Sequence, residues 1–267
     1  MSDELALVVV ADDAAQVRRS LIALTDQSVQ PEHVVVCSWD GLDSTVQALE
    51  TEWLALVPDG AEPSPEWVEV LTTNLGLESV GCIGGRVLRL SGASTLTEWF
   101  DEDAPVAWYD GIGEEHSHLA DVPNTVLRCS ASFLRYDNMA ARIRVARALL
   151  QAGVPLGRSV NESSACLVAA RMGLDVVYDS RLVVCRILPP SMEDRIGGFA
   201  DWRAASRSGM WALRHLPGAG SSARVLHRIL IGTRRMPGML LGPAFWPKPA
   251  RRHRWLQVVR GSIDGLK

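Results

Sequence analysis

Residues 5–37 read LALVVVADDAAQVRRSLIALTDQSVQPEHVVVC, and their pattern indicates the fold class. It opens on a continuous apolar run from Leu5 to Val10, as expected of a strand that is covered on both faces. Two aspartates then offer a helix N-cap, and apolar residues recur after them at helical spacing. A second apolar run, His33 to Cys37, follows a proline-containing loop. The pattern predicts a strand–helix–strand unit whose two strands lie parallel and side by side.

The same alternation continues downstream of this unit. Gly41 to Glu50 fits a short helix, and Trp53 to Val57 is predicted to be the next strand. The turn PDGAEP, residues 58–63, separates this strand from a helix that begins near Pro65. Residues 81–90 form a further apolar strand, which we expect two glycines to break. We therefore predict an α/β fold of three layers around a mostly parallel central sheet, with sites at the carboxyl ends of its strands.

The second half of the chain is less regular. Residues 91–125 combine acidic and aromatic residues with weak periodicity, which predicts a long ordered loop over the sheet. A helix is expected from Asn161 to Arg171, followed by two short strands at Val176 to Tyr178 and Leu182 to Cys185. We expect this α/β domain to cover residues 1–194, and residues 195–267 to form a separate C-terminal extension.

Charge separates these two parts. Residues 1–194 hold 29 acidic and 13 basic residues, a net of −16, whereas residues 195–267 hold 14 basic and two acidic residues, a net of +12. In the basic part, tryptophan and aliphatic residues are interleaved with arginine, as in amphipathic helices that lie at a membrane interface. We predict an anionic membrane surface as its partner. The acidic domain itself is an alternative, and nucleic acid is disfavoured because the interleaved residues follow helical spacing.

Three further observations predict the compartment. The apolar run at residues 5–10 lacks the basic start and the length of a secretory signal. No stretch reaches about 18 uncharged apolar residues, the length of a spanning helix. The five cysteines have no metal-ligand spacing and are expected to be buried free thiols. These features predict a cytoplasmic protein that is peripheral at the inner face of the membrane.

Five segments resemble, in order, the family 2 glycosyltransferases of actinobacterial type. The first is VVVADDAAQVRRSLIALTDQSVQPEHVVV (8–36), which is similar to the family's opening unit. LVPDGAEPSPEWV (56–68) resembles its acidic metal-binding turn, and CIGGRV (82–87) resembles the strand that follows. NESSACLVAARMGLDVVYD (161–179) is similar to the helix that carries the catalytic base, and RGSIDGLK (260–267) to a closing motif. The resemblance implies a GT-A fold that binds a nucleoside diphosphate sugar.

The resemblance also implies where the donor binds. We expect Ala11, Asp12, Ser38 and Asp40 to hold the nucleoside diphosphate, because they follow the first two strands of an open α/β sheet. Ser38 stands where the family usually has an Asp. Only about a dozen residues separate Asp40 from the strand at residues 53–57, so a strand and a helix usual in the family are expected to be missing.

The metal and the base are implied in the same way, with departures from the family pattern. Asp59 and Glu62 would hold Mg²⁺ or Mn²⁺ and through it the donor, although the Asp-x-Asp turn here reads Pro58-Asp59-Gly60. The alternative for these two acids is a solvated turn. Glu162 falls at the position of the base in inverting transfer, in the pair Asn161-Glu162 where the family has Glu-Asp. Its alternative is a helix-terminal acid that the helix dipole favours.

Two functions of different class follow. The first is an inverting transferase that moves a sugar from a nucleoside diphosphate to a membrane-associated glycan or lipid-linked acceptor. The second is a catalytically inactive, glycosyltransferase-like partner protein, which the degenerate turn favours. His116 and His118 lack a third metal ligand in the sequence, and Arg135 matches an arginine near the family's acceptor strand but fits a surface position better.

Overall fold

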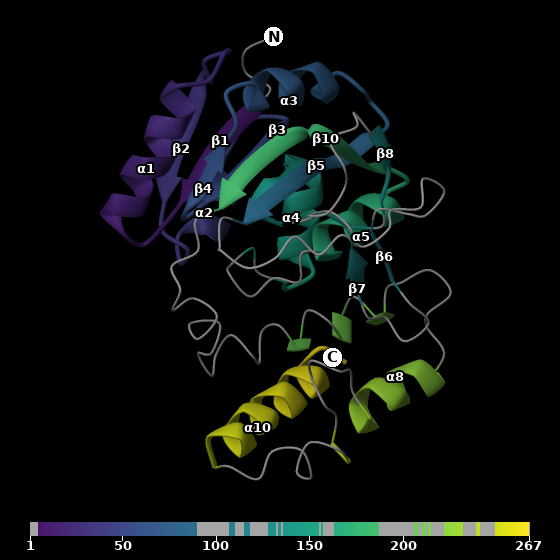
Figure 1. Ribbon diagram of the computed structural model, residues 1–267. Helices are drawn as coiled ribbons and strands as arrows, with labels where there is room; N and C mark the ends of the chain where they lie inside the picture. Colours follow the sequence, from purple (N-terminus) through teal and green to yellow (C-terminus); the bar gives the residue numbers. More distant parts are fainter. Residues whose placement is uncertain are drawn as a thin grey trace.

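The computed structural model describes residues 5–89, 107–109, 115–117, 128–131, 133–134, 136–154, 156, 163–186, 206–207, 210–211, 213–214, 222–231, 239–240 and 249–266 (Figure 1). Its strands are β1 (Leu5–Val10), β2 (His33–Cys37), β3 (Trp53–Pro58), β4 (Ala61–Pro63), β5 (Val80–Arg89), β6 (Ala107–Tyr109), β7 (Glu115–Ser117), β8 (Arg128–Ser130), β9 (Met139–Arg142) and β10 (Asp175–Arg186). Its helices are α1 (Ala14–Thr25), α2 (Leu42–Ala48), α3 (Trp67–Leu75), the 3-10 turn η2 (Tyr136–Asn138), α4 (Ile143–Gln151), α5 (Ser163–Arg171), α8 (Ser222–Leu230) and α10 (Pro249–Asp264).

The main sheet has eight strands in the order β2-β1-β3-β9-β5-β10-β4, with β8 paired to β10. β1 is parallel to β2 and β3, and β10 is parallel to β5. β9 is antiparallel to both β3 and β5, so β3 and β5 run in the same direction. The strands β1, β2, β3, β5 and β10 therefore share one carboxyl edge. The predicted strand–helix–strand unit and mostly parallel sheet are confirmed.

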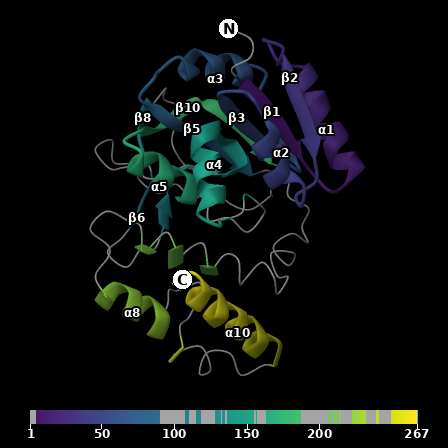
Figure 2. The ribbon, with the colours of Figure 1, turned by 180° about the vertical axis from the view of Figure 1, so that it is seen from behind.

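Helices cover both faces of the sheet, which gives the predicted three layers (Figures 1 and 2). Residues of β1 alternate between the faces, as the pleat of a strand requires. Leu7 and Val9 pack in a cluster with residues of α1 and α3. Val8 and Val10 pack in a second cluster with residues of α2, α4 and α5. β3 is buried along its whole length because both of its faces are covered.

The glycines of β5 do not break the strand, contrary to the expectation from the sequence. A Cβ atom on Gly84 would lie 2.3 Å from the carbonyl oxygen of Asn138, and one on Gly85 would lie 2.2 Å from that of Leu182. Glycine is therefore required for the close approach of neighbouring backbone. The two short strands expected at residues 176–185 are one strand, β10, whose register with β5 shifts between Tyr178 and Val183.

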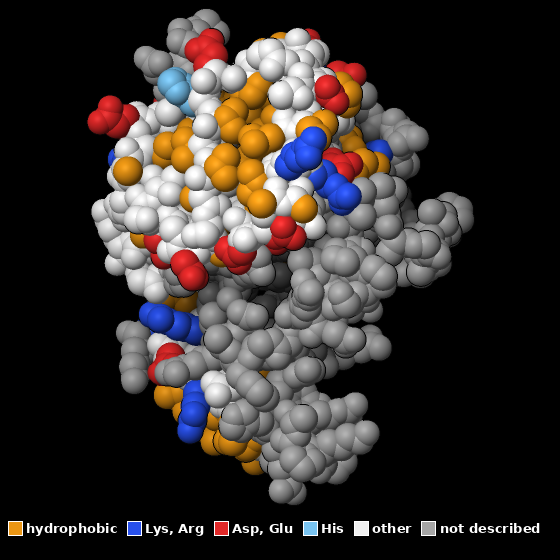
Figure 3. All heavy atoms as spheres, turned by 90° about the vertical axis from the view of Figure 1, so that its left-hand side faces the viewer, with side chains coloured by type: hydrophobic (Ala, Val, Ile, Leu, Met, Phe, Trp, Pro, Cys, Tyr) orange, Lys and Arg blue, Asp and Glu red, His pale blue; other side chains and the backbone are white. Residues whose placement is uncertain are grey.

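β2 is an edge strand, because the short connection to β3 contains no further strand that could pair with its free side. α2 is the single element between β2 and β3, so the expected lack of a further strand and helix is confirmed. Val34 and Val36 point to one side of this edge and are partly exposed. Figure 3 shows this side of the molecule, where apolar side chains gather in the middle and acidic side chains lie along the lower border.

The C-terminal helices lie beyond the carboxyl edge of the sheet (Figures 1 and 2). The Ser206 hydroxyl donates to the carbonyl oxygen of Val258 in α10 at 2.7 Å, and Met210 packs near α8. Trp211 instead packs against the main core, so Met210 and Trp211 contact the C-terminal helices and the α/β core respectively. Among the described residues, no helix has both the length and the apolar character needed to span a membrane.

Two expectations fall largely outside the described residues. The predicted boundary between residues 194 and 195 lies there, so the division into two domains stays a prediction. Of the predicted loop at residues 91–125, the structure describes β6 and β7, which pair antiparallel.

Candidate functional site

Three loops begin side by side at the carboxyl edge of the sheet. Val10 is aligned with Cys37 of β2 and with Pro58 of β3. Ala11, Ser38 and Asp59 therefore each stand one residue beyond the same row of the sheet. The backbone N–H of Ala11 still donates to the carbonyl oxygen of Cys37 at 3.1 Å, which continues the β1–β2 ladder into the loops. The structure thus brings together three positions that are distant in the sequence.

One side-chain hydrogen bond connects the first two loops, and another lies within the second loop. The Asp12 carboxylate accepts the backbone N–H of Trp39 at 3.2 Å, and the Ser38 hydroxyl accepts that of Gly41 at 3.2 Å. Asp13 caps α1 by accepting the N–H of Ala15 at 2.8 Å. Asp12, Ser38 and Asp40 all have exposed side chains. This edge presents polar groups to solvent on loops that hydrogen bonds hold together.

The third loop is the acidic turn. Asp59 is half-buried, and Gly60 has φ of 75°, a left-handed conformation that favours glycine. β4 follows at once and pairs antiparallel with β10, aligning Glu62 with Cys185. The turn therefore reverses the chain immediately after Asp59.

Glu62 faces α1. Its Oε1 lies 3.5 Å from Nε of Arg19, and it lines a hollow of about 330 Å³ with residues of α1. Burial, and then the Glu62 charge, raise the pKa of the Cys185 thiol. In the described part of the chain, no group of three or more His, Cys, Asp or Glu side chains is placed to hold a metal ion. Of the two acids in this turn, Asp59 lies next to the edge, and its carboxylate suits Mg²⁺ or Mn²⁺ where phosphate oxygens supply other ligands.

A buried hydrogen-bond cluster around Asn138 supports this turn, and the sequence did not predict it. The Asn138 Nδ2 group donates to the carbonyl oxygens of Arg86 and Leu182, both at 2.8 Å. Its Oδ1 accepts the indole N–H of Trp67 at 2.8 Å. The cluster joins α3, β5 and β10 where β10 changes register. Beyond that point β10 pairs with β4, which follows Asp59 and Gly60 directly.

An ion pair stabilises the same irregular part of β10. Asp179 is fully buried, and its carboxylate accepts hydrogen bonds from Arg181 Nε at 3.0 Å and Nη2 at 2.6 Å. Burial acts to raise the pKa of Asp179, but the hydrogen bonds and charge of Arg181 outweigh it, so that pKa is lowered. Burial also raises the pKa of the neighbouring Tyr178 to about 12.

Glu162 lies outside the described residues, and its role stays a prediction. α5 begins at the next residue, Ser163, and leads through a short turn into β10. Because β10 runs with the parallel strands, the start of α5 lies at the carboxyl edge. Asp43 of α2 accepts the backbone N–H of Leu156 at 2.9 Å, on the segment before α5. The structure does not test the roles of His116, His118 and Arg135. It describes only the backbone of His116, in β7, and the other two residues lie outside the described residues.

The sheet order, the layers and the loops at the carboxyl edge define a GT-A-like α/β fold. Neither a protein-family model nor a curated protein sequence matches the chain. Among solved structures, the chain is similar to S. aureus TarS, with a TM-score of 0.57 and 11% identity over 99% of this chain and 49% of that chain. The present chain therefore spans about half the length of that protein.

Two further solved structures show the same likeness. TarS 1-349 in complex with UDP-GlcNAc has a TM-score of 0.58 and 9% identity, covering 99% of this chain and 82% of that one. GalNAc-T7 with UDP, GalNAc and Mn²⁺ has a TM-score of 0.57 and 10% identity, covering 95% and 54%. These neighbours are glycosyltransferases with GT-A-like folds. Identities this low show a common fold and carry no residue-level correspondence.

Proposed function

We propose that this chain is a glycosyltransferase that takes a sugar from a nucleoside diphosphate donor. The observation that carries the proposal is the alignment of Ala11, Ser38 and Asp59 at one carboxyl edge of a GT-A-like sheet. Open α/β sheets bind ligands at such an edge. The structural neighbours support the nature of the ligand, since they were solved with UDP-GlcNAc or with UDP and GalNAc.

In the proposed donor site, Asp12, Ser38 and Asp40 contact the nucleoside. The bond from Trp39 N–H to the Asp12 carboxylate fixes the β1 loop against the β2 loop, so these groups are positioned before the donor arrives. Asp59 would hold the divalent metal, which supplies positive charge to the diphosphate leaving group. Glu62 remains a candidate second ligand, and it would have to leave Arg19 to reach the metal.

The transfer step is proposed to be inverting, with Glu162 as the base. A carboxylate on the face opposite the leaving group would accept the proton of the acceptor hydroxyl as its oxygen attacks the anomeric carbon. The start of α5 at the carboxyl edge supports this assignment, because Glu162 directly precedes Ser163. The acceptor is proposed to be a membrane-associated glycan or lipid-linked sugar, with residues 195–267 holding the cytoplasmic protein against an anionic inner membrane face.

A catalytically inactive partner protein is the second candidate, and the acidic turn favours it. The turn has one acid where the family has two, and the nearby Glu62 is already paired with Arg19. In this second function the fold and the membrane contact would persist without transfer.

Calorimetric titration tests the proposal. UDP, GDP and dTDP sugars are titrated into the full chain with and without Mn²⁺. We expect one nucleotide to bind in the micromolar to millimolar range and Mn²⁺ to strengthen its binding. Binding without turnover on any acceptor would support the inactive partner. No binding by all three nucleotides at millimolar concentration would refute the donor site and with it the transferase.

A further inference from the structure

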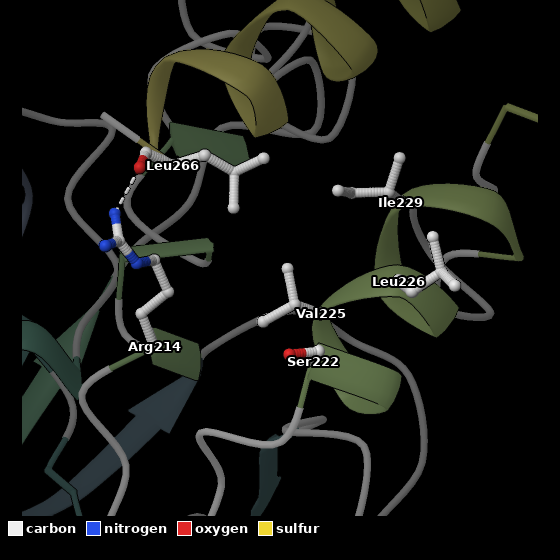
Figure 4. A pocket seen from close by; sticks show the side chains of 6 residues that line it. All are labelled: Arg214, Ser222, Val225, Leu226, Ile229 and Leu266. Atoms are coloured by element: carbon white, nitrogen blue, oxygen red, sulfur yellow. Dashed lines mark hydrogen bonds between the residues drawn. The ribbon is translucent and has the colours of Figure 1, made fainter.

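α8 has apolar residues on two of its faces. On the inner face, Val225 and Ile229 point toward Leu266 and line a pocket of about 300 Å³ together with Arg214 and Ser222 (Figure 4). This face packs with Met210 and Leu213 and explains why α8 is held against the rest of the C-terminal region. Leu226 also lines this pocket, but 54% of the residue remains exposed to solvent.

The exposed apolar surface continues past the end of the helix. The backbone N–H groups of Met239 and Leu240 donate to the carbonyl oxygens of Ile229 and Leu230 at 2.8 and 2.9 Å. These bonds satisfy helix-terminal carbonyls and bring residues 239–240 to the end of α8. Leu240 is 63% exposed, the highest value for a large apolar side chain in the described residues. We define the α8 outer patch as Leu226, Ile231, Met239 and Leu240.

The charge of the sequence in this region indicates which partner covers the patch. Residues 222–240 contain four arginines and no acidic residue, within a region of net charge +12. Contact between this patch and the same patch of a second copy would bring two such regions together, and like charges oppose that contact. An apolar patch in a basic region suits a partner that has an apolar interior and a negatively charged surface. An anionic bilayer has both.

We propose that the α8 outer patch inserts into the headgroup region of an anionic bilayer, with α8 and residues 239–240 as the membrane-binding elements. The inference rests on the proposed membrane role of residues 195–267 and names the residues that carry it. The apolar side chains provide insertion, and the arginines provide attraction to lipid phosphates, so neither contribution alone is sufficient.

Vesicle sedimentation of the full chain tests this inference. Vesicles of equal phosphatidylglycerol and phosphatidylcholine are compared with phosphatidylcholine vesicles at low and high salt. We expect the chain to sediment with the anionic vesicles and to be released by salt, because screening weakens the attraction. Leu240→Glu should lower the partition constant about tenfold or more, since leucine burial changes an equilibrium by roughly that factor. Leu240→Gln should lower it somewhat less, because it adds no negative charge.

Ile22→Glu is the matched control. Ile22 is 53% exposed, but it lies on α1, so the same change in charge and polarity should alter vesicle binding less than about twofold. Equal losses for Leu240→Glu and Ile22→Glu would overturn the inference, as would no binding of the original chain. Variants that change the oligomeric state in gel filtration instead would assign the patch to a protein contact and also overturn it.

Donor titration of the same variants separates the two proposals. Nucleotide-sugar binding should be unchanged in Leu240→Glu, because the patch is not part of the proposed donor site. Donor binding without vesicle binding would reject the membrane inference and leave the transfer proposal intact. Vesicle binding without donor binding would support the membrane inference and reject the transfer proposal.

Discussion

Replacement of Asn138 is expected to be among the most destabilising single changes in the α/β domain. Asn138 is 1% exposed, and its side chain makes three hydrogen bonds, two as donor and one as acceptor. In Asn138→Ala, the indole N–H of Trp67 and two backbone carbonyls lose this partner. A buried polar group that loses its partner costs about 1–3 kcal/mol. The three together predict a loss of about 3–9 kcal/mol, a large part of the ~5–15 kcal/mol that stabilises a typical domain.

Asn138→Asp should make the stability of the protein depend on pH, and the geometry fixes the direction of that dependence. The aspartate keeps an acceptor for Trp67 but directs its second oxygen at the carbonyl oxygens of Arg86 and Leu182. Burial and these two oxygens oppose ionisation, so its pKa in the folded state is raised above the ordinary value of about 3.9. The variant is therefore most stable below about pH 4 relative to the original chain, and it loses stability as pH rises through the raised pKa.

Urea denaturation followed by tryptophan fluorescence between pH 4 and 8 measures both effects. Thr73→Ala is the control, because the exposed Thr73 hydroxyl bonds only to a carbonyl of its own helix. It should cost less than about 1 kcal/mol. A loss below about 1 kcal/mol in Asn138→Ala, or a loss in Asn138→Asp that does not change with pH, would refute the role given to the cluster. Donor titration of Asn138→Ala should also show weaker binding, since the cluster supports the turn at Asp59.

Three further changes test the site. Asp59→Asn should weaken donor binding in Mn²⁺ and leave the melting temperature nearly unchanged; equal titration curves would remove Asp59 from the metal site. Glu162→Gln should reduce turnover by roughly 10²-fold or more while donor binding survives. Unchanged turnover would make Glu162 a helix-terminal acid. Arg181→Gln should destabilise the chain by about 1–3 kcal/mol at neutral pH, because it leaves the buried Asp179 charge without its ion pair. The lowered pKa of Asp179 makes the original ion pair stabilising above about pH 4, so the difference between the two proteins in denaturation should shrink as pH falls further.

Sequence periodicity predicted the elements whose signal is local. The apolar runs of β1 and β3 are continuous, and α3 follows a proline-containing turn with apolar residues at helical spacing. β9 was missed because Met139–Arg142 has no β-branched residue, and its place between β3 and β5 depends on pairing with both. α4 was also missed, although Ile143, Ala146 and Leu149 recur at helical spacing and all face the core.

The candidate site was predictable only in part, because some of its contacts join residues that are far apart in the sequence. Ala11, Ser38 and Asp59 could be placed together, since parallel strands end at a common edge. The Asn138 cluster could not be predicted, because Asn138 and Trp67 are 71 residues apart and nothing local marks them. Glu62 is close to Asp59 in the sequence, but the pairing of β4 with β10 places its side chain beside Arg19. Proximity in sequence therefore does not establish that the two acids share a ligand.

The proposed donor site and the proposed membrane-binding patch lie toward the same side of the sheet. Figures 1 and 2 show α8 and α10 beyond the carboxyl edge of the sheet, the edge at which Ala11, Ser38 and Asp59 lie. If α8 contacts the membrane, the donor edge lies on the membrane side of the sheet. An acceptor carried by a lipid would then reach the carboxyl edge from the membrane side. A water-soluble acceptor gains nothing from this arrangement. Transfer that proceeds equally well to soluble and lipid-linked acceptors on anionic vesicles would therefore argue against the coupling of the two surfaces.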